Sequence, residues 1–504
     1  MIRKKLLKKI YNCYNTPLIL FLILFLGFSL RFYNLSEESL WGDELATVKL
    51  SAQPLSYLLN PKINLPVDTY HLILHYCMRI FGQSEFSVRF PAMIFGVFSI
   101  FVIYLIGKRV FNREIGIFSS LILAISPFHI HYSQEARAYS LLMLLSLTST
   151  YYFMKLIKSN DHKYIIVYTI STLIGIYTHY FIFFLLLFQN IYLIIYNLKK
   201  KKLVKRWLIS QFIISLIFLL YHPYFLKHIA WATNGGFAYL IPYFSLVSII
   251  KALYVFVSDY AFINSYYCVP CFYVNPLIIF LISVFFLFII LIGIQSLFSN
   301  KWNIRELIQK NDKLLFLLLY LTVPIIGLYA ISLITPLYQV KYIIYSSTPL
   351  YILASLGISK FKNIMKLGIT TIMLFLFSSV LFGYYIDVTK EQWRETSKFI
   401  DIHSKERDLV LSPYFTFVFD YYHVEIDKKR VVPDGYIYPK DENEIYGKPL
   451  KSSYINQSIS NYNRIWLVLP PTWKLEDYDA ITKEFKTLIL EKRFKGVEIY
   501  LFEV

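Results

Sequence analysis

The chain has 504 residues, of which 57% are hydrophobic and 19% aromatic, whereas only 16% are charged. A soluble globular protein would carry about 25% charged residues, so the composition excludes an ordinary soluble enzyme and indicates an integral membrane protein. The formal net charge is +19. Lysine-rich loops such as 199–202 supply much of it, and membrane topology explains such loops better than nucleic-acid binding does.

Eleven apolar segments recur along the first three quarters of the chain, and each approaches the ~20 residues that cross a bilayer. The first follows a basic N-terminus and precedes no small-residue cleavage site, so we expect a retained anchor rather than a signal peptide. We therefore expect a mostly α polytopic membrane protein with spans near residues 18–32, 90–107, 115–129, 139–157, 164–178, 180–197, 207–226, 276–298, 314–334, 343–359 and 367–386.

The basic residues divide the loops between these spans into two sets. One set contains 24 lysines and arginines, whereas the rest of the membrane part contains nine. Because basic loops stay in the cytoplasm, the first set and the N-terminus are expected there. An odd number of spans then places the C-terminal segment outside. Most acidic residues of the membrane part also fall on the external side, so we expect any chemistry at that face.

Two external segments, 33–87 and 227–275, are long enough to hold structure of their own. Tyr70–Phe81 and Ser245–Phe262 predict helices that lie along the membrane interface. Cys268 and Cys271 form a C-x-x-C in the second segment. Without a second pair they indicate a local disulfide or two idle thiols rather than a zinc site.

The composition changes after residue 386. Residues 387–504 contain 18 basic and 20 acidic residues, so this part is nearly neutral. We divide the chain into a transmembrane domain, 1–386, and a small extracytoplasmic α/β domain, 387–504. The pattern predicts helices and strands in the order helix Glu391–His403, strand Asp408–Pro413, strand Arg464–Leu469, helix Leu475–Glu491 and strand Val497–Phe502.

The acidic pair Asp43-Glu44 follows the first span and is the leading candidate for chemistry. Neighbouring residues on a helix point about 100° apart, so the two carboxylates should have different tasks. One would accept a proton from an acceptor hydroxyl, while the other would orient a loop or bind a cation. The alternative is that both cap a short solvated helix.

A second external group, Ser133–Tyr139, contains Glu135, Arg137 and Tyr139. An arginine can form two parallel hydrogen bonds with a phosphate or a carboxylate, so Arg137 indicates either a phosphate contact or a salt bridge. Lys341, beside Tyr342, indicates a second phosphate contact or a lysine that reaches toward the interface.

Three histidines also lie in external segments. His71 and His75 have the i, i+4 spacing of metal ligands, although packing at the interface is the more common role of such a pair. His179, in a tight turn, has a weaker claim. The sequence predicts no metal site and leaves open whether a divalent cation takes part.

These motifs resemble the GT-C superfamily of membrane glycosyltransferases, especially the branch of the protein O-mannosyltransferases and lipid A aminoarabinose transferases (a family 39-like group). The resemblance is good over residues 15–150, thin over 150–330, and returns at 338–410. It rests on Trp41-Gly42-Asp43-Glu44, Leu74–Gly82, Ser87–Pro91, Ser133–Tyr139, Lys341-Tyr342 and Trp393-Arg394-Glu395.

The resemblance implies an inverting glycosyltransferase that takes a sugar from a polyprenyl phosphate and transfers it to an external hydroxyl of a protein, lipid or glycan. It implies that Asp43 activates or orients the acceptor, with Glu44 in support, and that Arg137 binds the donor phosphate. The chain departs from the pattern twice. Leu65-Pro66-Val67 stands in place of His-Pro-Pro, and Lys341-Tyr342 in place of Arg-Tyr, which keeps the cation but loses the bidentate contact.

The main alternative is a lipid flippase or transporter of cell-envelope precursors. Such proteins place charged residues at mid-membrane, and no Asp, Glu, Lys or Arg falls in the middle of any expected span. We therefore expect a transferase, and the partners we expect are the lipid-linked donor, membrane lipids and an acceptor, without nucleic acid.

Overall fold

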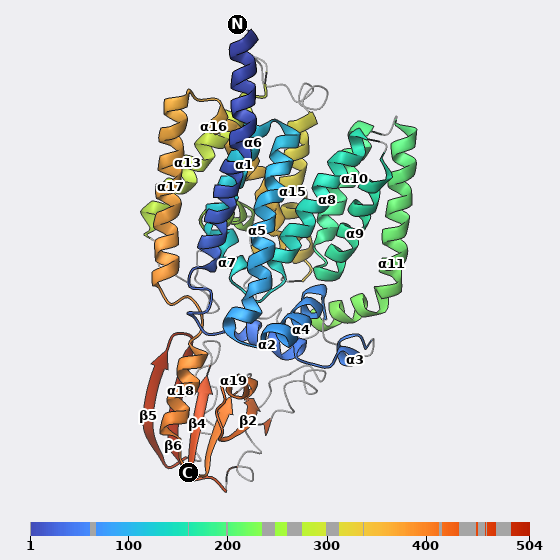
Figure 1. Cartoon of the computed structure of the whole chain (residues 1–504). Helices are drawn as coiled ribbons and strands as arrows, with labels where there is room; N and C mark the ends of the chain where they lie inside the picture. Colours follow the sequence, from blue (N-terminus) through green and yellow to red (C-terminus); the bar gives the residue numbers. More distant parts are fainter. Residues whose placement is uncertain are drawn as a thin grey trace.

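The structure is a computed structural model (Figure 1). It describes residues 2–60, 67–159, 161–197, 200–233, 247–259, 275–298, 312–335, 337–412, 416–432, 450–451, 459, 461–469 and 485–504.

Long helices form a bundle whose N-terminus lies at the end opposite the C-terminal sheet (Figure 1). Each of the eleven predicted spans coincides with a helix. They are α1 (Ile2–Phe32), α5 (Glu85–Val110), α6 (Arg113–Ile125) continued by α7 (Pro127–Ser133), α8 (Tyr139–Lys158), α9 (His162–Thr178), α10 (Ile182–Asn197), α11 (Lys201–Thr233), α13 (Pro276–Gln295), α15 (Asp312–Ser332), the 3-10 helix η2 (Val340–Ser346) continued by α16 (Ser347–Ser359), and α17 (Asn363–Ile386).

By length and composition alone, six of the helices in the described residues qualify as membrane spans. The bent pair α6–α7, with an angle of 59° at the break, brings the number to seven. Several predicted segments, such as α9 and α10, form helices of only 17 and 16 residues. The protein is a multi-pass membrane protein, while the count of eleven stays a prediction.

Residues 33–87, predicted to be external and called here the first external segment, contain the helices α2 (Gly42–Ser51), α3 (Leu55–Leu58) and α4 (Thr69–Phe81). They lie across the same end of the bundle as the C-terminal sheet (Figure 1). Asp68 caps α4 by accepting a hydrogen bond from the backbone N–H of His71 at 3.0 Å, which satisfies one of the free amides of the first turn. The predicted helix Tyr70–Phe81 is therefore present.

The C-terminal part contains α18 (Trp393–His403), α19 (Thr416–Tyr421) and a six-stranded sheet in the order β3-β2-β1-β4-β6-β5. The strands are β1 (Asp408–Ser412), β2 (Asp427–Val432), β3 (Leu450–Lys451), β4 (Arg464–Leu469), β5 (Thr487–Phe494) and β6 (Val497–Glu503). The pairs β3–β2, β2–β1 and β1–β4 are all parallel. In the β1–β4 pair, Val410 lies opposite Trp466. β6 runs antiparallel to both β4 and β5.

One predicted element of this part is wrong where the structure describes it. The expected helix Leu475–Glu491 ends inside β5, so residues 487–491 are strand. The reason is a tight turn at Lys495-Gly496, where Gly496 takes a φ of +70° and the chain reverses into β6. The earlier residues of that predicted helix lie outside the described part of the chain.

The second external segment is described only in part. Of the predicted helix Ser245–Phe262, the structure describes α12 (Val247–Ser258), whose buried Ala252 and Phe256 pack into the core of the helix bundle. Tyr351 on α16 donates a hydrogen bond to the carbonyl of Phe256 at 2.5 Å. The described part of α12 is thus integrated into the bundle. The predicted pair Cys268 and Cys271 lies outside the described residues.

A hydrophobic core joins the first external segment to the C-terminal part. Leu45 and Val48 of α2 and Leu74 of α4 belong to the same buried cluster as Trp393 of α18 and Trp466 of β4. Burying such side chains stabilises by about 1.5–3 kcal/mol each, so the cluster fixes the sheet against this end of the bundle.

Candidate active site

The acidic pair lies in the first turn of α2, and the helix separates its two carboxylates. Asp43 keeps 36% of its side chain exposed, whereas Glu44 has none exposed. Carboxylates in a first helical turn are stabilised by the free N–H groups of that turn. The two carboxylates therefore have different surroundings, as their different expected tasks require: Asp43 is exposed and Glu44 is buried.

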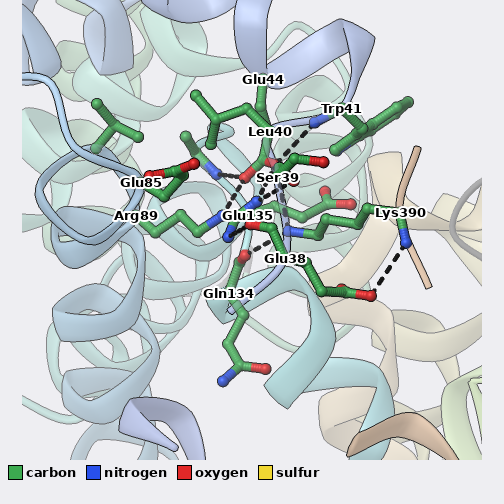
Figure 2. A network of polar contacts seen from close by, with 12 residues as sticks. Glu38, Ser39, Leu40, Trp41, Glu44, Glu85, Arg89, Gln134, Glu135 and Lys390 are labelled. Carbon is green, nitrogen blue, oxygen red and sulfur yellow. Dashed lines mark hydrogen bonds and ion pairs between the residues drawn. The ribbon is translucent and has the colours of Figure 1, made fainter. Parts of the chain in front are cut away.

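Glu44 lies at the centre of a polar network (Figure 2). Arg89, at the start of α5, donates Nε–H to Oε1 at 2.8 Å and Nη2–H to Oε2 at 2.7 Å. The backbone N–H of Ala136 donates to Oε1 at 2.8 Å. Lys390, after α17, donates to Oε2 at 3.2 Å and to the carbonyl of Gln134 at 2.9 Å. Glu44 thus holds together three segments that are distant in the sequence.

The charges of this network are mutually dependent. Burial opposes ionisation of Glu44, but the positive charges of Arg89 and Lys390 and the hydrogen bonds from Arg89 and Ala136 lower its pKa to about 2. Burial also lowers the pKa of Lys390, as does the nearby positive charge of Arg89. Removing Glu44 would leave both cations in the interior without their counter-charge.

Arg137 lies on the exposed side of α2, next to Asp43. Its Nη1 donates to the Thr47 hydroxyl at 2.8 Å and to the carbonyl of Asp43 at 3.3 Å. Its Nη2 lies 3.7 Å from Asp43 Oδ2. The Arg137 side chain is 28% exposed and that of Asp43 is 36% exposed, so the pair is partly open to solvent.

Lys341 at the start of η2 completes this group. Its ammonium lies 5.5 Å from the ring centre of Trp41 and 5.2 Å from that of Tyr139, at cation–π distance. Among the residues that the structure describes, no carboxylate forms an ion pair with it. The lysine is therefore a half-buried cation that aromatic faces hold in place and whose charge is available to an anion.

Aromatic rings form the wall between these groups. Tyr342 lies with its ring centre 6.3 Å from that of Tyr139, 4.9 Å from His179 and 5.3 Å from Phe181. Burial lowers the pKa of His179 to about 4, and the charges of Arg137 and Lys341 act in the same direction against an opposing effect of Asp68. His179, a weak candidate from sequence, is thus a neutral ring in the site.

Glu135 belongs to a separate buried group. Its Oε1 lies 3.2 Å from Nε2 of His131, whose Nδ1 lies 2.8 Å from Asp259 Oδ2. Burial raises the pKa of Glu135, but the hydrogen bond and the charge of His131 outweigh that effect and lower it. His131 thus links the loop before α8 to the C-terminal end of α12. Glu135 is buried and contacts this histidine.

The Nδ1 atoms of His71 and His75 have different partners. Nδ1 of His71 lies 2.8 Å from Asp68 Oδ1, and Nδ1 of His75 lies 2.8 Å from the carbonyl of Ser51. Within the described ranges, no group of three or more His, Cys, Asp and Glu could hold a metal ion. The two histidines tie α4 to its own cap and to the end of α2.

The sequence reasoning did not assign roles to Arg89, Lys390 and Glu391. Arg89 stands inside a motif of the resemblance, Ser87–Pro91, and that motif was the available signal. Lys390 and Glu391 lie four and five residues after the end of the last span, where charged residues are expected as the chain leaves the membrane.

Comparison with solved structures shows which known proteins share this fold. ArnT from Cupriavidus metallidurans in the apo state matches with a TM-score of 0.61 and 11% identity over 95% of this chain and 97% of that chain. The same protein bound to undecaprenyl phosphate matches with a TM-score of 0.60 and 11% identity over the same shares of the two chains. No curated protein matches the sequence.

Two further structures share the fold. The Archaeoglobus fulgidus oligosaccharyltransferase in the apo form has a TM-score of 0.56 and 11% identity over 97% of this chain and 74% of that chain. The arabinofuranosyltransferase AftD from Mycobacteria has a TM-score of 0.53 and 10% identity over 96% and 40%.

This chain shares the fold of these three proteins. Its residues 69–225 match the sequence model of the dolichyl-phosphate-mannose-protein mannosyltransferases.

Proposed function

We propose that this protein transfers a hexosyl or pentosyl group from a polyprenyl phosphate to an acceptor hydroxyl, with inversion, at the external face of the membrane. The observation that carries the proposal is the meeting of Asp43, Arg137 and Lys341 at one aromatic-lined site. A carboxylate beside two cations suits a reaction in which a hydroxyl loses a proton while a phosphate leaves.

The reaction divides between the two kinds of group. Asp43 accepts the proton of the acceptor hydroxyl while the hydroxyl oxygen forms a bond to the anomeric carbon. The bond from that carbon to the phosphate oxygen breaks, and its electron pair stays with the polyprenyl phosphate. Arg137 and Lys341 offset the charge that develops on this leaving group.

The fold supports a lipid-linked donor. Nucleotide sugars are cytoplasmic, so a transferase at the external face needs a donor that is carried in the bilayer. The structural neighbour from Cupriavidus metallidurans binds undecaprenyl phosphate, and an Archaeoglobus fulgidus neighbour of TM-score 0.54 was solved with a tethered acceptor peptide. We propose the same donor class for this chain.

The test incubates the purified protein in proteoliposomes with radiolabelled polyprenyl-phosphate sugars and cell-envelope fractions, which supply protein, lipid and glycan acceptors. We expect label in an acceptor together with free polyprenyl phosphate. Translocation of labelled lipid without cleavage of the sugar–phosphate bond would identify a flippase instead and would refute the proposal.

A further inference from the structure

The segment that links α17 to α18 reaches back to the first external segment. We call residues 388–394 the strap. The hydroxyl of Thr389 donates to Glu38 Oε2 at 2.6 Å, and Arg394 donates to Glu85 at 3.2 Å. The strap therefore lies directly against the segment that carries the acidic pair.

Two strap residues contact the acidic pair or the residues beside it. Lys390 donates to the buried Glu44, as Figure 2 shows. Glu391, only 8% exposed, accepts the backbone N–H of Gly42 at Oε2, at 3.0 Å. Its own carbonyl accepts the hydroxyl of Ser39 at 2.5 Å. Gly42 directly precedes Asp43, so Glu391 satisfies a first-turn amide that no helical carbonyl can reach.

The sheet supports Glu391 from the other side. The indole N–H of Trp393 donates to the same Oε2. The turn between β5 and β6 packs on the strap: the N–H of Gln392 donates to the carbonyl of Lys495, and the N–H of Lys495 donates to Gln392 Oε1, both at 2.9 Å. A Cβ placed on Gly496 would lie 2.8 Å from Glu391 Cγ.

We propose that Glu391 is a positioning residue for the transfer reaction, through which the C-terminal part holds the N-terminus of α2 and so sets the direction of Asp43. The inference rests on the proposed function for its catalytic consequence, whereas its structural consequence stands by itself. Misplacing a catalytic group by about 1 Å can cost on the order of 100-fold in rate. The strap thus makes the C-terminal part a component of the active site.

Three variants of the full-length protein separate this role from general stability. Glu391→Ala removes the acceptor, Glu391→Gln keeps an oxygen that can accept from both Gly42 and Trp393, and Asp401→Ala on the exposed side of α18 is the matched control. Backbone hydrogen exchange of residues 36–47 reports the position of α2 and needs no activity. Transfer kinetics report the catalytic consequence.

We expect Glu391→Ala to increase exchange at residues 42–44 and to lower kcat on the order of 10–100-fold with little change in the KM of the donor. Glu391→Gln should restore both, and Asp401→Ala should leave both unchanged. Unchanged exchange in Glu391→Ala, or a Gln variant as impaired as the Ala variant, would overturn the proposal. Changed exchange in a protein that cleaves no donor would refute the proposed function and leave the positioning role intact.

Discussion

At the residue scale, the decisive feature is the different surroundings of two neighbouring carboxylates. Glu44 is enclosed by Arg89, Lys390 and the Ala136 amide, so its acceptor positions are occupied. Asp43 is partly exposed and has Arg137 as its ion-pair partner. We therefore assign chemistry to Asp43 and positioning to Glu44, both of which the sequence grouped as catalytic candidates.

Lys341 allows a sharp test of phosphate binding. Lys341→Gln should weaken binding of undecaprenyl phosphate on the order of 10-fold or more, because it removes a cation without a carboxylate partner in the described residues. Lys341→Arg should retain binding, since the charge remains. Lys49, whose ammonium lies 5.5 Å from the ring centre of Phe417, provides the matched control as Lys49→Gln. Equal affinities for all of these variants would exclude Lys341 from the phosphate site.

Glu391 predicts a pH dependence of stability. Burial and the charge of Asp43 raise its pKa to about 7, against the hydrogen bonds from Trp393 and Gly42. The folded state then binds more protons than the unfolded state above the ordinary value of 4.5, so stability falls as the pH rises from 4.5 through 7. The loss is about 3 kcal/mol.

The expected observation is a thermal midpoint that decreases between about pH 5 and pH 7 by more in the wild type than in Glu391→Gln, which does not titrate. Parallel curves for the two proteins would show that Glu391 keeps an ordinary pKa.

The residues of the site were partly predictable. Asp43, Arg137, Lys341 and Tyr342 come from segments with visible motifs, and the structure brings them together. Lys390 and Glu391 contact residues 346 and 349 positions earlier in the chain. No local pattern encodes such a contact, because it depends on how the C-terminal sheet packs on α2.

At the element scale, the turn between β5 and β6 explains why residues 487–491 form a strand and not the predicted helix. The short apolar run Leu488–Leu490 fits a helix or a strand, and Lys495-Gly496 is the local sign of a hairpin. The same turn packs closely against Glu391, since a Cβ on Gly496 would lie 2.8 Å from Glu391 Cγ. The turn between β5 and β6, which the sequence analysis did not predict, therefore supports the proposed active site.

Gly496→Ala tests that support. The added methyl group would meet Glu391 and would force a side chain into the left-handed region, so we expect transfer to fall several-fold, with a strain of about 1–2 kcal/mol. Gly82→Ala is a matched control, because Gly82 also has a positive φ of +79° but a Cβ added there would have no atom within 4 Å. Equal loss of transfer in both variants would attribute the effect to backbone strain alone.

At the scale of the whole molecule, the Glu44 network joins the helix bundle, the first external segment and the C-terminal part. The helical segments were accessible from the sequence because apolar runs are local signals. The way in which these three parts contact one another could not be predicted from the sequence. It depends on the buried Glu44 carboxylate, which pairs with Arg89 of α5 and Lys390 of the strap (Figure 2).

Glu44→Gln should therefore destabilise the whole protein by about 3–5 kcal/mol, because it leaves Arg89 and Lys390 buried without their counter-charge. Glu37→Gln, a position in the same segment outside this network, should change little. Because the folded pKa of Glu44 is depressed, the unfolded state takes up the proton first, and the wild type should lose stability as the pH falls from 4.5 toward 2. Equal thermal midpoints for the two variants would contradict a joining role for Glu44.

The most direct test of the central claim is the rate of sugar transfer from a radiolabelled polyprenyl phosphate by wild type and Asp43→Asn. Asparagine keeps the size of the side chain but cannot accept the acceptor's proton. We expect kcat to fall on the order of 10²–10⁴-fold, with donor binding and the thermal midpoint retained. Transfer at the wild-type rate by Asp43→Asn would contradict the assignment of Asp43 as the general base.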